Sequence, residues 1–135
     1  MHASIAESNY QKLMDPRHIK RLNLVQNLYS YCFSVDGKTK IFPNKKDSKL
    51  TNEIIDHLDE IDLHISKSAP KYPINKIAKT DLSILRLAVF ELLIDKKEPT
   101  KVVINEAVEI AKELGNERSF AFINAVLGSI NTTKS

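Results

Sequence analysis

Residues that break helices, form disulfides or cross membranes are scarce in this sequence. Among 135 residues there are 3 glycines, 5 prolines and no tryptophan, and so few turn-forming residues favour long helices over a many-turned β fold. The single cysteine, Cys32, cannot form a disulfide within the chain. No apolar run approaches the roughly 18 residues of a membrane span, and Met1 to Tyr10 lacks the basic and apolar regions of a signal peptide. These absences predict a cytoplasmic protein with no membrane segment.

Motifs of common catalytic and metal sites are also missing. The chain has no glycine-rich phosphate loop, no CxxC pair and no HExxH motif. His57 and His64 lie on one expected helix, but seven residues place them about 10 Å apart along its axis, which is too far for one zinc ion. We therefore expect neither an enzyme nor a metal or cofactor site.

The formal net charge of +3 is distributed unevenly along the chain. Residues 1–50 contain 9 Lys and Arg against 4 Asp and Glu, residues 51–98 contain 7 against 9, and residues 99–135 contain 4 of each. An excess of cations at one end favours an anionic partner there, although a surplus of this size also occurs on ordinary solvated surfaces.

The first helix has a clear start. Asp15 suits the N-cap and Pro16 the first helical position, and the helix is expected to run to about Ser34. Its core-facing residues recur at spacings of three and four; they are Leu22, Val25, Leu28, Tyr29 and Cys32. Residues 1–14 are expected to be a flexible extension, and the five lysines between 38 and 49 to lie in a polar connector.

Four further helices follow from the spacing of apolar residues. They are expected from about residue 50 to 65, 81 to 94, 100 to 114 and 117 to 130. The helix from about residue 50 to 65 carries Ile54, Leu58, Ile61 and Ile65 on one face. The last helix carries Phe120, Ile123, Val126, Leu127 and Ile130. Gly115 is expected to end the fourth helix in the left-handed conformation.

The helix from Asp81 to Ile94 is apolar on nearly all sides, which predicts a central position among the other helices. Thr80 or Asp81 is its expected cap. Arg86 interrupts the apolar pattern, and a buried guanidinium needs a carboxylate partner. We expect that partner to be Glu106 in the following helix. Residues 15–135 should form one all-α domain, with subdomains at about 15–70 and 74–131.

Four cations lie in the first turns of the first helix: Arg17, His18, Lys20 and Arg21. Cations are unfavourable at the positive end of a helix dipole, so helix stability alone does not explain them. Two interpretations stay open at this point. The four side chains form a solvated basic turn, or they form a patch that contacts nucleic-acid phosphates.

The second half of the chain resembles the NusB family of transcription antitermination factors. The resemblance rests on Asp81-x-x-Ile-Leu-Arg-Leu-Ala-x-x-Glu-Leu92, on Pro99-x-x-Val-x-Ile-Asn-Glu-Ala-Val-Glu-Ile-Ala-Lys112, and on Phe122-Ile-Asn-x-Val-Leu127. Arg17, Arg21 and Val25-Gln-x-Leu-Tyr29 are similar to the family's arginine-rich motif and the helix that follows. The motif is thinned here, because His18 and Ile19 stand where the family often has arginines.

The resemblance implies a NusB-like fold of two small helical bundles packed around the central helix. It also implies a non-enzymatic antitermination factor that binds boxA-type single-stranded RNA of ribosomal RNA transcripts. The implied partners are the ribosomal protein NusE and the RNA polymerase antitermination complex, and some members of the family form homodimers. An alternative is a non-catalytic interaction module like those beside ribosomal RNA methyltransferase domains.

Site residues follow from the resemblance by position. Arg17, His18, Lys20 and Arg21 would contact RNA, and Phe122 would either stack on an unpaired base or pack in the core. Tyr29 and Asp81 match positions on the face that binds the partner protein.

Overall fold

A computed structural model describes residues 15–35 and 41–134, and every regular element in these ranges is helical. The expected extension at 1–14 and part of the lysine-rich connector lie outside the described residues. In chain order the elements are α2 (Pro16–Tyr31), the 3₁₀ turn η1 (Lys45–Asp47), α3 (Ser48–Asp56), α4 (Leu58–Ser68), the 3₁₀ turn η2 (Ile74–Lys76), α5 (Lys79–Phe90), the π turn η3 (Glu91–Asp95), α6 (Thr100–Leu114) and α7 (Ser119–Lys134). None of the described helices has the length and apolar character needed to cross a bilayer.

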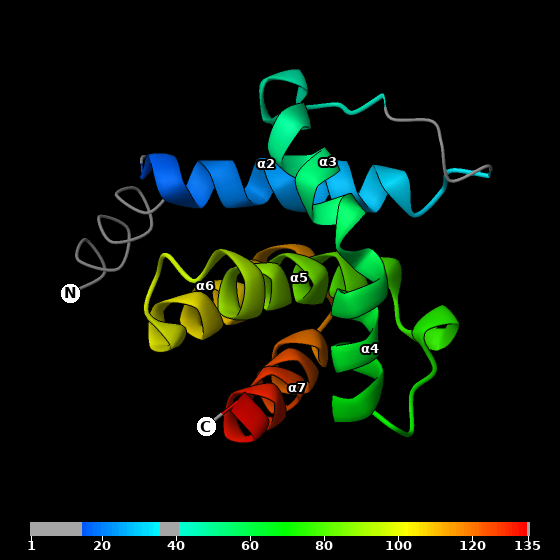
Figure 1. Cartoon of the computed structure of the whole chain (residues 1–135), viewed down its shortest axis with the longest axis vertical. Coiled ribbons are helices and arrows are strands. Elements are labelled where there is room, and N and C mark those ends of the chain that lie inside the picture. Colours follow the sequence, from blue (N-terminus) through cyan, green and yellow to red (C-terminus); the bar gives the residue numbers. More distant parts are fainter. Residues whose placement is uncertain (1–14, 36–40, 135) are drawn as a thin grey trace.

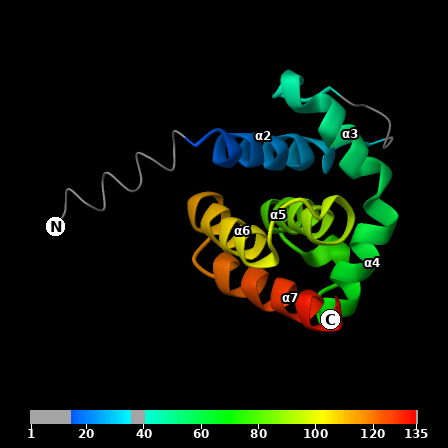
Figure 2. The same ribbon diagram turned by 60° about the vertical axis from the view of Figure 1, so that its left-hand side comes forward.

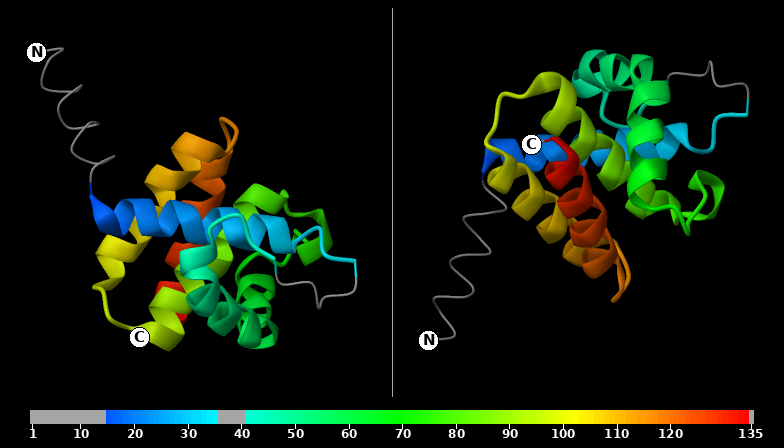
Figure 3. Two further views of the ribbon diagram at one scale, coloured as in Figure 1. Left: turned by 90° about the horizontal axis from the view of Figure 1, so that it is seen from above. Right: turned by 60° about the horizontal axis from the view of Figure 1, so that its bottom comes forward.

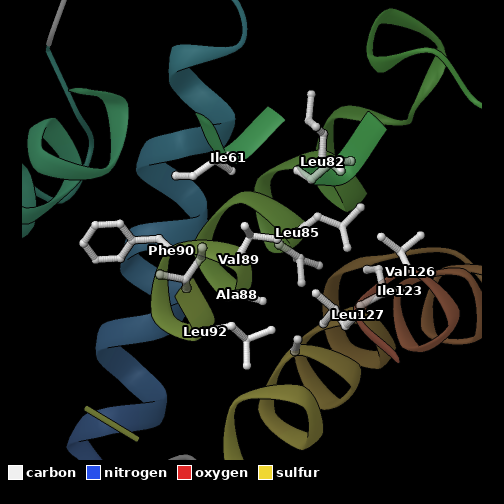
Figure 4. Close-up of a cluster of buried hydrophobic side chains, with 14 of the residues drawn as sticks. Ile61, Leu82, Leu85, Ala88, Val89, Phe90, Leu92, Ile123, Val126 and Leu127 are labelled. Atoms are coloured by element: carbon white, nitrogen blue, oxygen red, sulfur yellow. The ribbon is translucent and has the colours of Figure 1, made fainter. Parts of the chain in front are cut away.

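Helix α5 occupies the centre of the molecule, as the sequence predicts. It contacts α2, α3, α4, α6 and α7, and Figures 1 and 2 show α2 crossing on one side of it and α7 on the other. The view from above in Figure 3 shows α2 lying across the rest of the bundle. Leu85 and Val89 of α5 are fully buried, and they face Ile123 and Leu127 of α7 in the core shown in Figure 4.

The start of α2 has the cap that the sequence predicts. The Asp15 carboxylate accepts a hydrogen bond of 2.9 Å from the backbone N–H of Arg17, and Pro16 opens the helix. This backbone bond, with a side-chain bond from Arg17, holds the pKa of Asp15 below its usual value. The cap therefore fixes the residue at which α2 begins and, with it, the position of the basic residues in the first turn.

The second expected helix is interrupted. The chain forms α3 and α4 with a break at His57, whose φ of −104° and ψ of 10° leave the helical region. Ile54 before the break, and Ile61 and Ile65 after it, are all fully buried. The break changes the direction of the chain, so that α3 contacts α2 while α4 contacts α7.

A buried polar network joins α2 to the segment before α3. The Asn27 side chain is fully buried; it accepts a 2.9 Å bond from the Asn44 N–H and donates 3.0 Å bonds to the Asn44 carbonyl and to the Thr51 hydroxyl. Thr51 in turn donates to the Asp47 carbonyl at 2.7 Å. Because buried polar groups are costly when unpaired, this network fixes the position of η1 and the start of α3 against α2.

Two sequence expectations for the last helices are wrong. Phe120 is largely exposed rather than in the core, and the Lys112 ammonium lies 5.5 Å from its ring centroid. Gly115 is the C-cap residue of α6, as expected, but its φ of −90° and ψ of −173° are extended rather than left-handed. The other four core-facing residues of α7 are buried, as expected: Ile123, Val126, Leu127 and Ile130.

Gly115 is needed for space. A Cβ atom there would lie 2.4 Å from the Ser119 hydroxyl oxygen and 2.8 Å from the Ala111 carbonyl oxygen. The Ser119 hydroxyl is itself engaged, because it accepts a 3.0 Å bond from the Asn116 N–H at the start of α7. The turn between α6 and α7 thus has no room for a side chain at this position.

Gly115→Ala should lower the free energy of unfolding by about 1 to 3 kcal/mol, because the added methyl group overpacks the turn. Urea denaturation of the two proteins measures the difference. Gly128→Ala is the matched control: a Cβ there meets nothing within 4 Å, and alanine is the better helix former by about 1 kcal/mol. Equal destabilisation by both substitutions would contradict the steric explanation.

Candidate nucleic-acid interface

The four cations at the start of α2 divide into an outer and an inner pair. Arg17 and Lys20 are exposed. His18 and Arg21 are buried, with 1% and 8% of their surfaces exposed. The four residues predicted to contact RNA therefore do not form one patch, and only the outer pair is open to a ligand in this structure.

His18 is held between two carboxylates of α6. Its Nδ1 lies 2.9 Å from Glu106 Oε2, and its Nε2 lies 3.1 Å from Glu113 Oε1. Glu106 and Glu113 are two turns apart on one face of the helix, so they bracket the imidazole ring. These two contacts pin the first turn of α2 to α6.

Arg21 makes a bidentate ion pair with Glu91. Its Nη2 donates to Glu91 Oε1 at 2.8 Å and its Nε donates to Glu91 Oε2 at 3.0 Å. Burial opposes the charged form, but the hydrogen bonds and charge of Glu91, with charge from Glu106 and Glu98, outweigh it and raise the pKa of Arg21. Glu91 opens the π turn η3 at the end of α5, so this pair ties α2 to the central helix.

The spacing of residues along the apolar stripe of α2 indicates which two of the four cations are buried. Val25 and Leu28 are buried, and counting back in steps of four and three from Val25 reaches Arg21 and then His18. The inner cations thus continue the core-facing stripe toward the start of the helix. Treating all four as one group by their charge overlooks this spacing.

The outer pair borders a cavity of about 240 Å³ between α2 and the end of α5. Arg17, Lys20 and Lys97 line it together with the carboxylates of Glu53, Asp95 and Glu98. Of the outer pair, Arg17 is partly engaged, because its Nε lies 3.5 Å from Asp15 Oδ1 in an exposed ion pair. The basic character of this surface therefore comes from few side chains.

Phe122 lies in α7 and is partly buried against the core. Its ring makes an edge-to-face contact with Tyr72, with centroids 5.2 Å apart and an interplanar angle of 73°. Tyr72 belongs to the segment between α4 and η2. Phe122 thus packs partly against the core and partly against an aromatic side chain on the surface.

Tyr29 lies at an apolar groove. It is 41% exposed and stacks edge to face on Phe33, which is 57% exposed, with ring centroids 5.1 Å apart. The groove has a volume of about 550 Å³ and is lined by Val25, Gln26, Tyr29, Ser30, Phe33, Pro43, Thr80 and Leu114. Exposed apolar surface of this kind marks contact sites for proteins or other ligands.

Asp81 is buried in the first turn of α5, one residue after the groove residue Thr80. Neither of them caps the helix, because α5 begins at Lys79 and its N-cap position is Ala78. Within the described residues, Asp81 Oδ1 is buried without a hydrogen-bond partner. The positive end of the helix dipole favours a carboxylate here.

The predicted ion pair between Arg86 and Glu106 is wrong. Arg86 donates to Asp62 of α4, from Nη2 at 2.8 Å and from Nε at 3.0 Å, while Glu106 pairs with His18. Burial opposes the charge of Arg86, but hydrogen bonding to Asp62 and its charge outweigh burial and raise the pKa. The pair therefore joins the central helix to α4, which comes before it in the chain.

The sequence predicts no metal site. Such a site would need a cluster of acidic, histidine or cysteine side chains. Within residues 15–35 and 41–134, no three such side chains are grouped so that they would hold a metal ion.

Comparison with known proteins agrees with this architecture. The NusB family model matches residues 38–132. The transcription antitermination protein NusB of Chloroflexus aggregans is 36% identical over 139 aligned positions, which cover 90% of each chain. The NusB of Roseiflexus castenholzii is 49% identical over 76 residues, or 55% of this chain and 51% of the relative.

A solved structure extends the agreement to three dimensions. The structure of T. maritima NusB superposes with a TM-score of 0.72 at 32% sequence identity, covering 87% of this chain and 92% of the other. The matched proteins carry the name of a transcription antitermination protein rather than of an enzyme. Sequence and fold together show that the chain belongs to the NusB family.

Proposed function

We propose that this protein is a cytoplasmic transcription antitermination factor that binds boxA-type single-stranded RNA of ribosomal RNA transcripts together with NusE. The observation that carries the proposal is the pairing of two different surfaces on α2. Exposed cations lie at its start, and an exposed aromatic groove lies at its end. One suits an RNA backbone and the other a protein partner within the RNA polymerase antitermination complex.

The RNA surface is supported by the exposure of Arg17 and Lys20. Cations that neutralise phosphates release counterions, and each contact to a single strand adds about −0.7 to the slope of log K against log salt. With two exposed cations, α2 contributes a slope of about −1.4 on this basis. The contribution is modest, so we propose that NusE increases the affinity for RNA.

The partner surface is supported by Tyr29, Phe33 and the groove beside them. Aromatic residues are enriched at the centres of protein interfaces, where they anchor the partner in desolvated pockets. Asp81 directly follows the groove residue Thr80, and its Oδ1 is buried without a hydrogen-bond partner among the described residues. We propose that NusE docks on this groove, leaving the start of α2 free for RNA.

Arg17→Gln with Lys20→Gln should weaken binding to a boxA RNA by about tenfold at moderate salt, because two phosphate contacts are lost. Fluorescence anisotropy of a labelled RNA, with and without purified NusE and over a range of salt concentrations, measures the affinity and the slope. Arg21 is left unchanged, since its loss would disturb the ion pair with Glu91.

Lys45→Gln with Lys46→Gln is the charge-matched control, because both lysines are exposed on η1. It should change the affinity less than the α2 variant does. Equal affinities of the α2 variant and the unmodified protein, at every salt concentration and with NusE present, would rule out α2 as the RNA contact.

A further inference from the structure

The connection from α4 to α5 is a second basic surface, separate from α2. Residues 66–80 contain 4 lysines and no acidic residue. Lys67, Lys71, Lys76 and Lys79 are all exposed, and among the described residues no ion pair neutralises any of them. This differs from the start of α2, where carboxylates from α6 and η3 offset half of the cations.

An aromatic side chain projects from the middle of this basic segment. Tyr72 is 52% exposed, and its ring rests edge to face against Phe122 of α7. Its backbone N–H donates to the Ala69 carbonyl at 3.0 Å, and prolines stand two residues before it and directly after it. The turn and the prolines restrict the backbone, while Phe122 restricts the ring. Tyr72 is therefore a fixed aromatic surface rather than a loose side chain.

We propose that Tyr72, supported by Phe122 and flanked by Lys67, Lys71 and Lys76, is a stacking site for an unpaired base of single-stranded RNA. This inference rests on the proposed function, and it adds a second contact to the same RNA. Proteins that hold single strands combine cations that follow the backbone with aromatic rings on which bases stack. The segment supplies both within ten residues.

The same segment leads toward the groove at the end of α2. A cleft of about 340 Å³ separates it from α2, with Ile74, Asn75 and Lys79 on one side and Tyr31 on the other. The Lys79 ammonium lies 5.5 Å from the centroid of the Phe33 ring at the groove. The basic segment that carries Tyr72 therefore ends at the edge of the groove in which we place the partner protein.

The test compares two RNA lengths, about 6 and about 16 nucleotides, the longer matching the largest site sizes of single-strand binding domains. The unmodified protein should bind the longer RNA more tightly. Tyr72→Leu should weaken binding of the longer RNA by about tenfold, because one stacked base is lost, and should leave binding of the shorter boxA RNA unchanged. Tyr72→Phe is the matched control and should bind both RNAs normally.

A direct signal accompanies the affinity measurement. With 2-aminopurine placed at successive positions of the longer RNA, fluorescence should fall on binding at one position, and Tyr72→Leu should abolish that change. Lys67→Gln with Lys71→Gln and Lys76→Gln should reduce the salt slope by about 2 without affecting the packing of Tyr72. This variant keeps the test valid if Tyr72→Leu also lowers stability.

The outcomes separate the two proposals. Normal binding of the longer RNA by both the Tyr72→Leu and the triple lysine variants would overturn the stacking site and leave the proposed function intact. If these variants instead lose only the capture of NusE, the surface is a protein contact and the inference is overturned as well. Failure of the unmodified protein to bind either RNA, with or without NusE, would overturn the proposed function itself.

Discussion

Glu91→Ala is expected to lower the free energy of unfolding by about 3 to 5 kcal/mol, because it leaves the buried Arg21 guanidinium without its partner. Urea denaturation followed by circular dichroism measures the loss. The bidentate geometry and the burial of both side chains, which are 10% and 14% exposed, are the reasons for the large expected loss. The measurement tests whether Arg21 has a structural role.

The matched variant replaces both partners. Arg21→Met with Glu91→Met removes both charges and keeps apolar volume, so it should recover most of the stability lost in Glu91→Ala. RNA binding by this double variant should stay close to that of the unmodified protein. If Glu91→Ala instead costs less than about 1 kcal/mol and the double variant loses RNA binding, Arg21 leaves Glu91 to contact RNA and our assignment is wrong.

Asp62→Ala is expected to cost about 2 to 4 kcal/mol. It removes the acceptor of the two hydrogen bonds that Arg86 donates to a carboxylate, and the Arg86 side chain is 11% exposed. The loss should be smaller than for Glu91→Ala, since the Asp62 side chain is 25% exposed and solvent reaches the pair. Thermal or urea denaturation gives the value.

Glu106→Gln tests the pairing in the same assay. Because Glu106 contacts His18 rather than Arg86, its effect should add to that of Asp62→Ala within about 0.5 kcal/mol. A clear departure from additivity would mean that the two carboxylates share Arg86. Additivity would confirm two separate ion pairs, one on each side of the central helix.

Local sequence signals were sufficient for most of the helices and for the central position of α5. Asp15 and Pro16 mark a helix start through their own backbone chemistry, and the apolar residues around Leu85 need no knowledge of the partner helices. The break at His57 has no such signal, because neither proline nor glycine is present there. The break coincides with the change of neighbours, since α3 contacts α2 and α4 contacts α7.

The partners of buried charges depend on how the helices are arranged. Burial of Arg86 follows from its place in an apolar helix, but the choice between Asp62 and Glu106 depends on which sides of α5 are covered by α4 and α6. The burial of His18 and Arg21 is predictable from the sequence, since both residues continue the apolar stripe of α2. Their carboxylate partners lie 70 to 95 residues away along the chain and follow only from the fold.

The hydrogen bonds of the Asn27 side chain require a fixed number of residues between Asn44 and Thr51. This one side chain holds the backbone of Asn44 and the hydroxyl of Thr51 at the same time. An insertion or deletion between those two positions would break at least one of the bonds and leave a buried polar group unpaired. In this chain the length of the stretch from Asn44 to Thr51 is therefore a requirement of the buried network.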